Sequence, residues 1–412
     1  MLPLKWLVDP VRPITYGIVQ AGPDFPGGVP YIRPVDMSEN QGVRDPSRLL
    51  RTDPVIAAAY RRSTVKAGDV VVTIGPSFGK LMVVPPDLSG ANLTQGTARV
   101  AAATGVEPRF LYWALQAQPA RQHWHSAVGG ATFRALNLEP LSMTPMPQAS
   151  IEEQRRIADF LDLEALRIDA LIVKRHRQEA LVRARIRAAI NQKLDEVSEW
   201  VPLARLLRPE RDALIAGPFG SDLSGSDLLP QGHTPVFNQR TALSASFDDF
   251  DHYVSSVKAD ELRRFRTRAG DVLVTGRGTI GKSVVVPQDA PVGILHPCLL
   301  RVRTEPDLMS PALLDECLRW SDRIRAELRL QSSATTIDVI YSGTLRRLPV
   351  PKCSPQRQEA LLRQIRRWSE IGDRTSVKLK DQIRVFREHR ESLVTAAVTG
   401  QIDVTTARGV DE

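Results

Sequence analysis

The segment from Gly276 to Ser283, GRGTIGKS, is the part of the chain whose residue types and spacing most suggest chemistry. It fits the phosphate-binding loop pattern GxxxxGK[ST]. Such a loop binds a nucleotide when a helix follows it and points its N-terminal amides at the phosphates. Here Lys282 precedes SVVVP, which favours a strand. We therefore predict a β-hairpin with a basic edge residue that could contact a phosphate, and a P-loop ATPase is the weaker alternative.

The remaining candidates for chemistry are few. His123 and His125 flank Trp124 without a cysteine or carboxylate cluster at metal-ligand spacing, so we expect ordinary surface or packed histidines. Nucleophile-elbow, zinc-protease and methyltransferase signatures do not occur in the sequence. The chain is thus predicted to be no enzyme by itself and to bind neither metal nor cofactor.

Composition limits the class of protein further. The 412 residues carry a formal net charge of +8 with a pI near 9.6, which favours an anionic partner. The sequence lacks a secretory signal pattern and an apolar run long enough for a membrane span, so we expect a cytoplasmic protein that does not bind membranes. Cys298, Cys317 and Cys353 are expected to be unpaired thiols.

Long helices must position any functional residues. The segment from Ile151 to about Leu194 contains neither Gly nor Pro, and Ser150 with Glu153 forms a potential capping box at its start. At 1.5 Å per residue it would be roughly 60 Å long. Residues from about Ser354 to Gly400 repeat the design, with Gln358 matching Gln154. We expect both segments to act as spacers.

The repeat extends upstream of both helices. The segment VKAGDVVVTIGPSFGKLMVVPPD, from Val65, matches TRAGDVLVTGRGTIGKSVVVPQD, from Thr267. Each copy predicts a hairpin, and Pro311 to Leu330 predicts one helix in the second module. The chain is therefore two copies of a mixed α/β module followed by a long helix. Two diverged modules joined by long helices would suit the binding of two different half-sites in double-stranded DNA. Half-sites on one face of B-DNA are separated by multiples of about 10–10.5 bp.

Several motifs together resemble the specificity subunit of type I restriction-modification systems over essentially the whole chain. They are Glu153-Gln154, IADFLD from Ile157, IDALI from Ile168, GPFGSDL from Gly217, AGDVLV from Ala269 and AAVTGQID from Ala396. The opening of the first module, RPITYGI from Arg12, departs from the GPFGS form. Gly372 predicts a kink or a soft point in the second helix.

The resemblance implies an α+β fold with an internal pseudo-two-fold repeat, in which two target recognition domains are separated by two long helices packed as an antiparallel coiled coil. The expected divisions are a first recognition domain, a central helix, a second recognition domain, a C-terminal helix and a polar tail, at residues 1–149, 150–198, 199–353, 354–403 and 404–412.

The same resemblance implies the partners. Each domain would bind one half of a split, asymmetric double-stranded DNA site, and the helices would set the spacer. Two methyltransferase subunits would bring S-adenosylmethionine, and restriction subunits would use ATP and magnesium. A freestanding coiled-coil DNA-binding or scaffold protein without these partners is the alternative that the sequence leaves open.

Base reading requires polar side chains on loops that reach groove edges. The candidates in the first module are Arg33, Thr73, Ser77 and Lys80. Those in the second are Ser221, Asn238, Gln239, Arg240, Arg277, Thr279, Lys282, Ser332 and Thr335.

Overall fold

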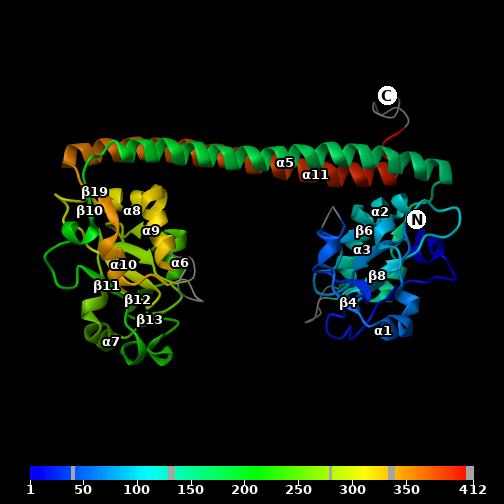
Figure 1. Ribbon diagram of the computed structural model, residues 1–412, viewed down its shortest axis with the longest axis horizontal. Coiled ribbons are helices and arrows are strands. Elements are labelled where there is room, and N and C mark those ends of the chain that lie inside the picture. The colour runs from blue at the N-terminus through cyan, green and yellow to red at the C-terminus, as the bar shows by residue number, and fades with distance from the viewer. Residues whose placement is uncertain (39–41, 129–134, 278–280, 333–338, 405–412) are drawn as a thin grey trace. The chain divides into compact units, whose positions relative to one another are not determined.

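The computed structural model describes residues 1–38, 42–128, 135–277, 281–332 and 339–404. The chain forms two compact units (Figure 1), one comprising Met1–His176 with Lys380–Glu412 and the other Arg177–Leu379. Helices α5 (Ile151–Asp195) and α11 (Pro355–Val398) each run through both units. The predicted class, a mixed fold with long helices, is confirmed. Among the described residues, none of the helices combines the length and apolarity needed to cross a bilayer.

Unit 1 contains small sheets and short helices. Its strands are β1 Leu2–Pro3, β2 Thr15–Tyr16, β3 Val29–Ile32, β4 Arg51–Thr52, β5 Val70–Thr73, β6 Leu81–Val83, β7 Asn92–Leu93, β8 Thr97–Val100 and β9 Pro145–Met146. Its short helices are α1 Pro54–Ala59, α2 Pro108–Gln116, α3 Gln118–Val128 and α4 Leu138–Ser142. The sheet orders are β2-β8-β5-β6, β4-β3-β7 and β1-β9.

Unit 2 repeats this plan with one extra strand in its second sheet. Its strands are β10 Trp200–Pro202, β11 Leu214–Ala216, β12 Thr234–Phe237, β13 Tyr253–Val254, β14 Arg266–Thr267, β15 Val272–Thr275, β16 Ser283–Val285, β17 Gly293–Leu295, β18 Leu299–Val302 and β19 Pro349–Pro351. Its short helices are α6 Gln239–Ser244, α7 Ser256–Glu261, α8 Pro311–Trp320, α9 Asp322–Ser332 and α10 Ser342–Arg347. The sheet orders are β11-β18-β15-β16, β13-β12-β17-β14 and β10-β19.

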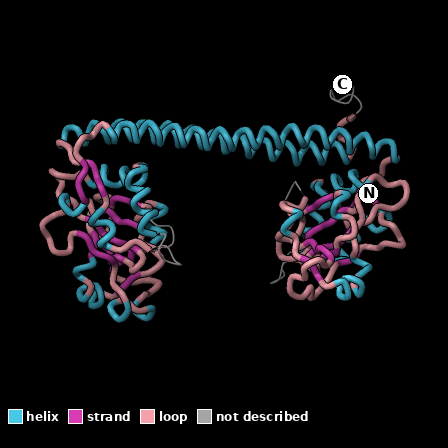
Figure 2. The backbone as a smooth tube through the Cα atoms, viewed as in Figure 1, coloured by secondary structure: helices cyan, strands magenta, loops and turns pink. Residues whose placement is uncertain are grey.

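The central strand of each main sheet has an uninterrupted apolar sequence because both of its faces are buried. In β5, Val70 and Val72 belong to the core beneath the helices, whereas Val71 belongs to a second core that includes β3 and β7. In β15, Val272 and Val274 face one core and Leu273 the other. Side chains of a strand alternate between faces, so a strand buried on both faces is apolar throughout. Figure 2 shows strands inside each unit, with helices and loops around them.

The two long helices pack antiparallel within each unit. In unit 1, Arg390 of α11 pairs with Asp169 of α5, with 3.4 Å between Nε and Oδ1. In unit 2, Ser376 donates to Glu179 at 2.5 Å. Gly372 lies within the unbroken α11, and a Cβ there would stand 2.5 Å from Cδ1 of Ile186. The sequence predicts a kink or soft point at this glycine; in the structure α11 continues through it, and Gly372 faces the tip of the Ile186 side chain on α5.

Helix boundaries follow their capping residues. The predicted box at the start of α5 is present, since the Ser150 amide donates to Glu153 at 3.3 Å and the Glu153 amide donates to the Ser150 hydroxyl at 3.2 Å. The prediction of one helix from Pro311 to Leu330 is wrong. Ser321 separates α8 from α9, and its hydroxyl accepts a hydrogen bond from the Ile324 amide at 3.3 Å. A serine that caps a new helix competes with continuation of the old one.

Candidate nucleic-acid interface

The two predicted hairpins are built in the same way. Thr73 is fully buried, and its hydroxyl accepts a hydrogen bond from the Lys80 amide and donates one to the Ser77 carbonyl, both at 2.9 Å. The hydroxyl of buried Thr275 likewise accepts from the Lys282 amide at 3.0 Å. Thr73 therefore fits a structural role and not a base contact. Strand β16, as expected, follows Lys282, so this segment lacks the helix that a P-loop requires there.

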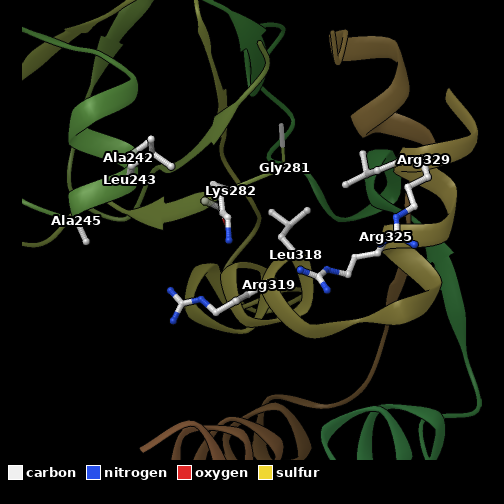
Figure 3. A pocket seen from close by; sticks show the side chains of 11 residues that line it. Ala242, Leu243, Ala245, Gly281, Lys282, Leu318, Arg319, Arg325 and Arg329 are labelled. Atoms are coloured by element: carbon white, nitrogen blue, oxygen red, sulfur yellow. The ribbon is translucent and has the colours of Figure 1, made fainter. Parts of the chain in front are cut away.

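Lys282 lines a basic cavity of about 470 Å³, here called the unit 2 hairpin pocket (Figure 3). Arg319 of α8 and Arg325 and Arg329 of α9 contribute the other charged side chains. Leu318 and Leu328 supply apolar wall, together with residues of α6. The described lining residues include four cationic side chains and no carboxylate. An anion would be the complementary ligand.

The charges around this pocket are only partly compensated. Arg319 pairs with Asp315 of the same helix at 3.3 Å. Burial lowers the pKa of Arg325, the nearby Arg187 guanidinium lowers it further, and Asp322 opposes the shift. The lowered pKa means that the positive charge of Arg325 is disfavoured where it stands. A bound anion would offset this cost.

The corresponding cavity in unit 1, the unit 1 hairpin pocket, has a different charge pattern. It measures about 660 Å³, and its described charged lining consists of four cations and two carboxylates: Lys80, Arg121, Arg387, Arg390, Asp169 and Glu391. The Lys80 ammonium donates to the Met37 carbonyl at 3.3 Å, and Arg121 pairs with Glu391 at 3.1 Å. Here cations meet carboxylates of the long helices, so this pocket offers less net positive charge.

A second group of predicted residues meets where strands of unit 2 end. Asn238 and Gln239 follow β12, and Arg277 follows β15 closely. The His296 amide donates to the Phe237 carbonyl at 3.0 Å, and the Gly276 amide donates to the Cys298 carbonyl at 2.9 Å. These bonds bring the ends of the strands together. We call Phe219, Asn238, Gln239, Arg240, Arg277, His296 and Cys298 the strand-end patch.

Side chains of the strand-end patch differ in how far they are engaged. The exposed Arg277 lies over the Phe219 ring, with 5.0 Å from its Cζ to the ring centroid. Within the described part of the chain it has no carboxylate partner. Arg240, in contrast, pairs with Asp249 at 3.0 Å and with Asp251 at 2.9 Å. Hydrogen bonding to Asp249 raises the pKa of Arg240. Arg277 is therefore the freer of the two cations.

Other patch residues are held in place. The Asn238 amide group donates to Asp251 at 2.6 Å, and its oxygen accepts from the Thr241 amide at 3.2 Å, which caps α6. Burial lowers the pKa of His296 and raises that of Cys298, whose Sγ lies 3.0 Å from the imidazole Nδ1. The pair is thereby kept neutral, as suits hydrogen bonding more than nucleophilic chemistry.

The remaining predicted residues fall in different surroundings. Arg33 follows β3 as Asn238 follows β12, and it binds Asp36 through Nε at 2.9 Å and Nη2 at 2.8 Å. That bond to Asp36 raises the Arg33 pKa. Ser77 is exposed in its hairpin. Thr279 and Thr335 lie outside the described residues, and the side chains of Ser221 and Ser332 are also outside the described part.

Sequence reasoning missed the arginines that complete the unit 2 hairpin pocket. Arg325 and Arg329 stand four residues apart in α9, so their spacing in the sequence could have predicted a cationic helix face. Which loop this face would meet depends on the fold. Phe219 belongs to the GPFGSDL motif that carries the resemblance, but was not identified as a binding residue, and His296 carried no signal beyond its residue type.

The described residues of the site are arranged for binding an anionic or polar ligand. Among the described His, Cys, Asp and Glu residues, none form a group of three that could hold a metal. The three cysteines are free, as predicted, and burial raises the pKa of Cys317.

Comparison with known proteins finds similarity to a specificity subunit of a type I restriction enzyme. No family model matches the chain. A segment of 156 residues, 37% of the chain, is 33% identical to the type I restriction enzyme EcoBI specificity subunit of Escherichia coli. The match covers 32% of that relative, so the chain spans about a third of its length.

A solved structure has a similar fold over nearly the whole chain. A chain from a study of complex assembly and conformational transition of the type I R-M system has a TM-score of 0.70 at 16% identity, and the match covers 97% of both chains. The HsdS subunit from Thermoanaerobacter tengcongensis gives 0.48 at 16% identity, over 97% of this chain and 96% of that one.

Proposed function

We propose that this chain, a homologue of the type I specificity subunits whose resemblance to them is confirmed, selects the DNA site of a type I restriction-modification complex. The observation that carries the proposal is the duplicated unit whose binding surfaces have diverged. Unit 2 presents a cationic hairpin pocket and a polar strand-end patch, whereas the unit 1 hairpin pocket mixes cations with carboxylates. Related scaffolds with different surfaces suit two different half-sites.

In this proposal each unit binds one half of a bipartite, asymmetric site in double-stranded DNA, and the helices set the spacer. The lengths of α5 and α11, 45 and 44 residues, support the role of spacers. Cationic side chains would bind backbone phosphates, and the patch would contact base edges in the groove. These contacts fix position and sequence without any bond being made or broken by this chain.

The chemistry belongs, in the same proposal, to partner subunits in the cytoplasm. Two methyltransferase subunits bring S-adenosylmethionine, and restriction subunits use ATP and magnesium. Exposed apolar side chains on the long helices, including Leu166 at 68% and Leu181 at 60% exposure, support a role in partner binding.

Methylome sequencing tests the proposal. Methylated bases are mapped in a host with the intact gene and in one that lacks it. We expect methylation at one split, asymmetric motif to disappear with the gene. Identical methylomes, together with failure of the tagged chain to retain an S-adenosylmethionine-binding subunit, would favour the freestanding DNA-binding or scaffold alternative.

Replacing Arg277 by alanine is expected to relax recognition at one base pair of one half-site. Arginine donates two hydrogen bonds to guanine in the major groove, worth about 1–3 kcal/mol of discrimination. The methylated motif should then become degenerate at that position, while the other half-site stays unchanged. Arg33→Ala, at the unit 1 position that corresponds to Asn238, is the comparison variant, and its effect should be confined to the opposite half-site. A motif that is unaltered by Arg277→Ala contradicts this role.

A further inference from the structure

We propose that the unit 2 hairpin pocket binds one backbone phosphate of double-stranded DNA and that its unit 1 counterpart does not. The inference rests on the proposed function and adds to it a phosphate site formed by Lys282, Arg319, Arg325 and Arg329. Its ligand class is a phosphodiester. DNA backbone and free nucleotides share this anionic chemistry, and the site commits to DNA for the geometric reasons below.

The pocket brings cations from three elements to one cavity. Lys282 leaves the hairpin at the start of β16, Arg319 comes from the last turn of α8, and Arg325 and Arg329 come from successive turns of α9. Figure 3 shows Lys282 facing the helix that carries Leu318 and Arg319, with Arg325 on the neighbouring helix. Such convergence is costly without an anion, because like charges repel each other in a partly buried space.

Lys282 and Arg325 are the residues most available to a ligand. Over the described ranges, neither side chain has a carboxylate within ion-pair distance, whereas Arg319 shares its charge with Asp315. Burial and the neighbouring Arg187 disfavour the charge of Arg325, and a phosphate would reverse this effect. The two side chains come from the hairpin and from α9, so a phosphate between them would join two elements of the unit.

The surroundings of the pocket favour a DNA phosphate over a free nucleotide. A P-loop encloses its phosphates with the amides of a following helix, but β16 occupies that position here. Lys282 is exposed, and Leu243 in the pocket wall lies on α6, the helix that also carries Arg240 of the strand-end patch. A phosphate bound here would therefore orient a duplex whose bases meet that patch.

Unit 1 provides an internal control of the same fold. Its Lys80 and Arg121 occupy hairpin and α3 positions, as Lys282 and Arg325 occupy the hairpin and α9. Both are engaged, Lys80 by the Met37 carbonyl and Arg121 by Glu391. Asp169 and Glu391 also offset two of the four described cations that line that cavity, through ion pairs with Arg390 and Arg121. The two units should thus differ in their electrostatic contribution to DNA binding.

The test measures binding of the full chain to a fluorescent duplex of arbitrary sequence over a range of salt concentrations. Each phosphate neutralised on B-DNA contributes about −0.9 to the slope of log K against log salt. Lys282→Gln/Arg325→Gln should weaken binding roughly tenfold at low salt and make the slope about one unit less steep. The matched Lys80→Gln/Arg121→Gln variant should leave the slope unchanged. The single substitution Lys282→Arg keeps both positive charges. This variant should bind the duplex nearly as tightly as the unmodified chain.

The outcomes separate the two proposals. If the intact chain binds no duplex, both the proposed function and the pocket assignment fail. If it binds and the two double variants lose equal slope, or neither loses any, the pocket assignment fails and the proposed function stands. ATP and inorganic phosphate are titrated as competitors. Displacement of duplex by micromolar ATP through Lys282 would identify a nucleotide site and overturn the assignment to DNA. Circular dichroism melting excludes unfolding as the cause of any loss.

Discussion

Asp271→Ala is expected to lower the free energy of unfolding of unit 2 by about 3 kcal/mol, because it removes the nearest carboxylate of the buried Arg303, which keeps only Glu210 at 3.3 Å and Asp212 at 3.8 Å. Asp271 is 2% exposed and accepts from Nε of Arg303 at 2.8 Å and from the Arg268 amide at 2.9 Å. Arg301 is wholly buried beside it. Chemical denaturation of the full chain, followed through its two transitions, measures the loss.

The motif AGD that carries Asp271 explains why the effect is large. Gly270 has a φ of +84°, which lets the chain turn so that the aspartate carboxylate accepts the Arg268 amide. Unit 1 has the same turn, with Gly68 at +88° and Asp69 binding Arg12 and the Lys66 amide. Asp289→Ala, at an exposed site, is the control and should change stability by less than about 0.5 kcal/mol. An equal change in both variants would contradict the role given to the buried pair.

Gln358→Ala is expected to cost about 2 kcal/mol, because it leaves three partly buried backbone groups without this partner. The Gln358 side chain, 2% exposed, accepts from the Ser310 amide at 2.7 Å and donates to the carbonyls of Leu308 at 2.9 Å and Cys353 at 3.0 Å. These bonds fasten the start of α11 to the loop before α8. The measurement is the unfolding midpoint of unit 2 in denaturant.

The matched position is Gln154, which accepts from the Glu107 amide and donates to the Ala149 carbonyl, both at 2.9 Å. Gln154→Ala should lower the stability of unit 1 by a smaller amount, since fewer bonds are lost. Glu359→Ala, next to Gln358 and exposed, should have little effect. If Gln358→Ala melts like the intact chain, the glutamine does not fasten the helix. A changed preference for the length of the DNA spacer in the Gln358→Ala variant would indicate in addition that the Gln358 bonds fix the start of α11 as a spacer helix.

The two glutamines and the two AGD turns show why the repeat could be predicted from the sequence. Each makes hydrogen bonds within its own unit that constrain its residue type, and so the letters recur at matching positions. The same holds for the strand β15, whose burial on both faces requires an apolar run. Local capping by Ser150 also follows from the sequence, because the partners are three residues apart.

Other features depended on contacts between distant segments. Thr73 is a plausible base-reading residue in the sequence, and only the folded hairpin shows that its hydroxyl is buried and engaged. Arg325 is 43 residues from Lys282 in the chain, and the packing of α9 beside the hairpin makes them one pocket. In the sequence, Gly372 indicates a weak point of a helix. In the structure, it lies against Ile186 of the other long helix.

The sequence by itself therefore determined the duplicated α/β modules, the long helices, the basic character and the absence of recognisable catalytic signatures. These properties depend on local hydrogen bonding, periodicity and composition, which neighbouring residues express directly. The tertiary structure decided which cations converge and which are already paired, as Arg240 is with Asp249 and Asp251. Charge availability is a property of distances between side chains far apart in the chain, and for that reason no sequence pattern contains it.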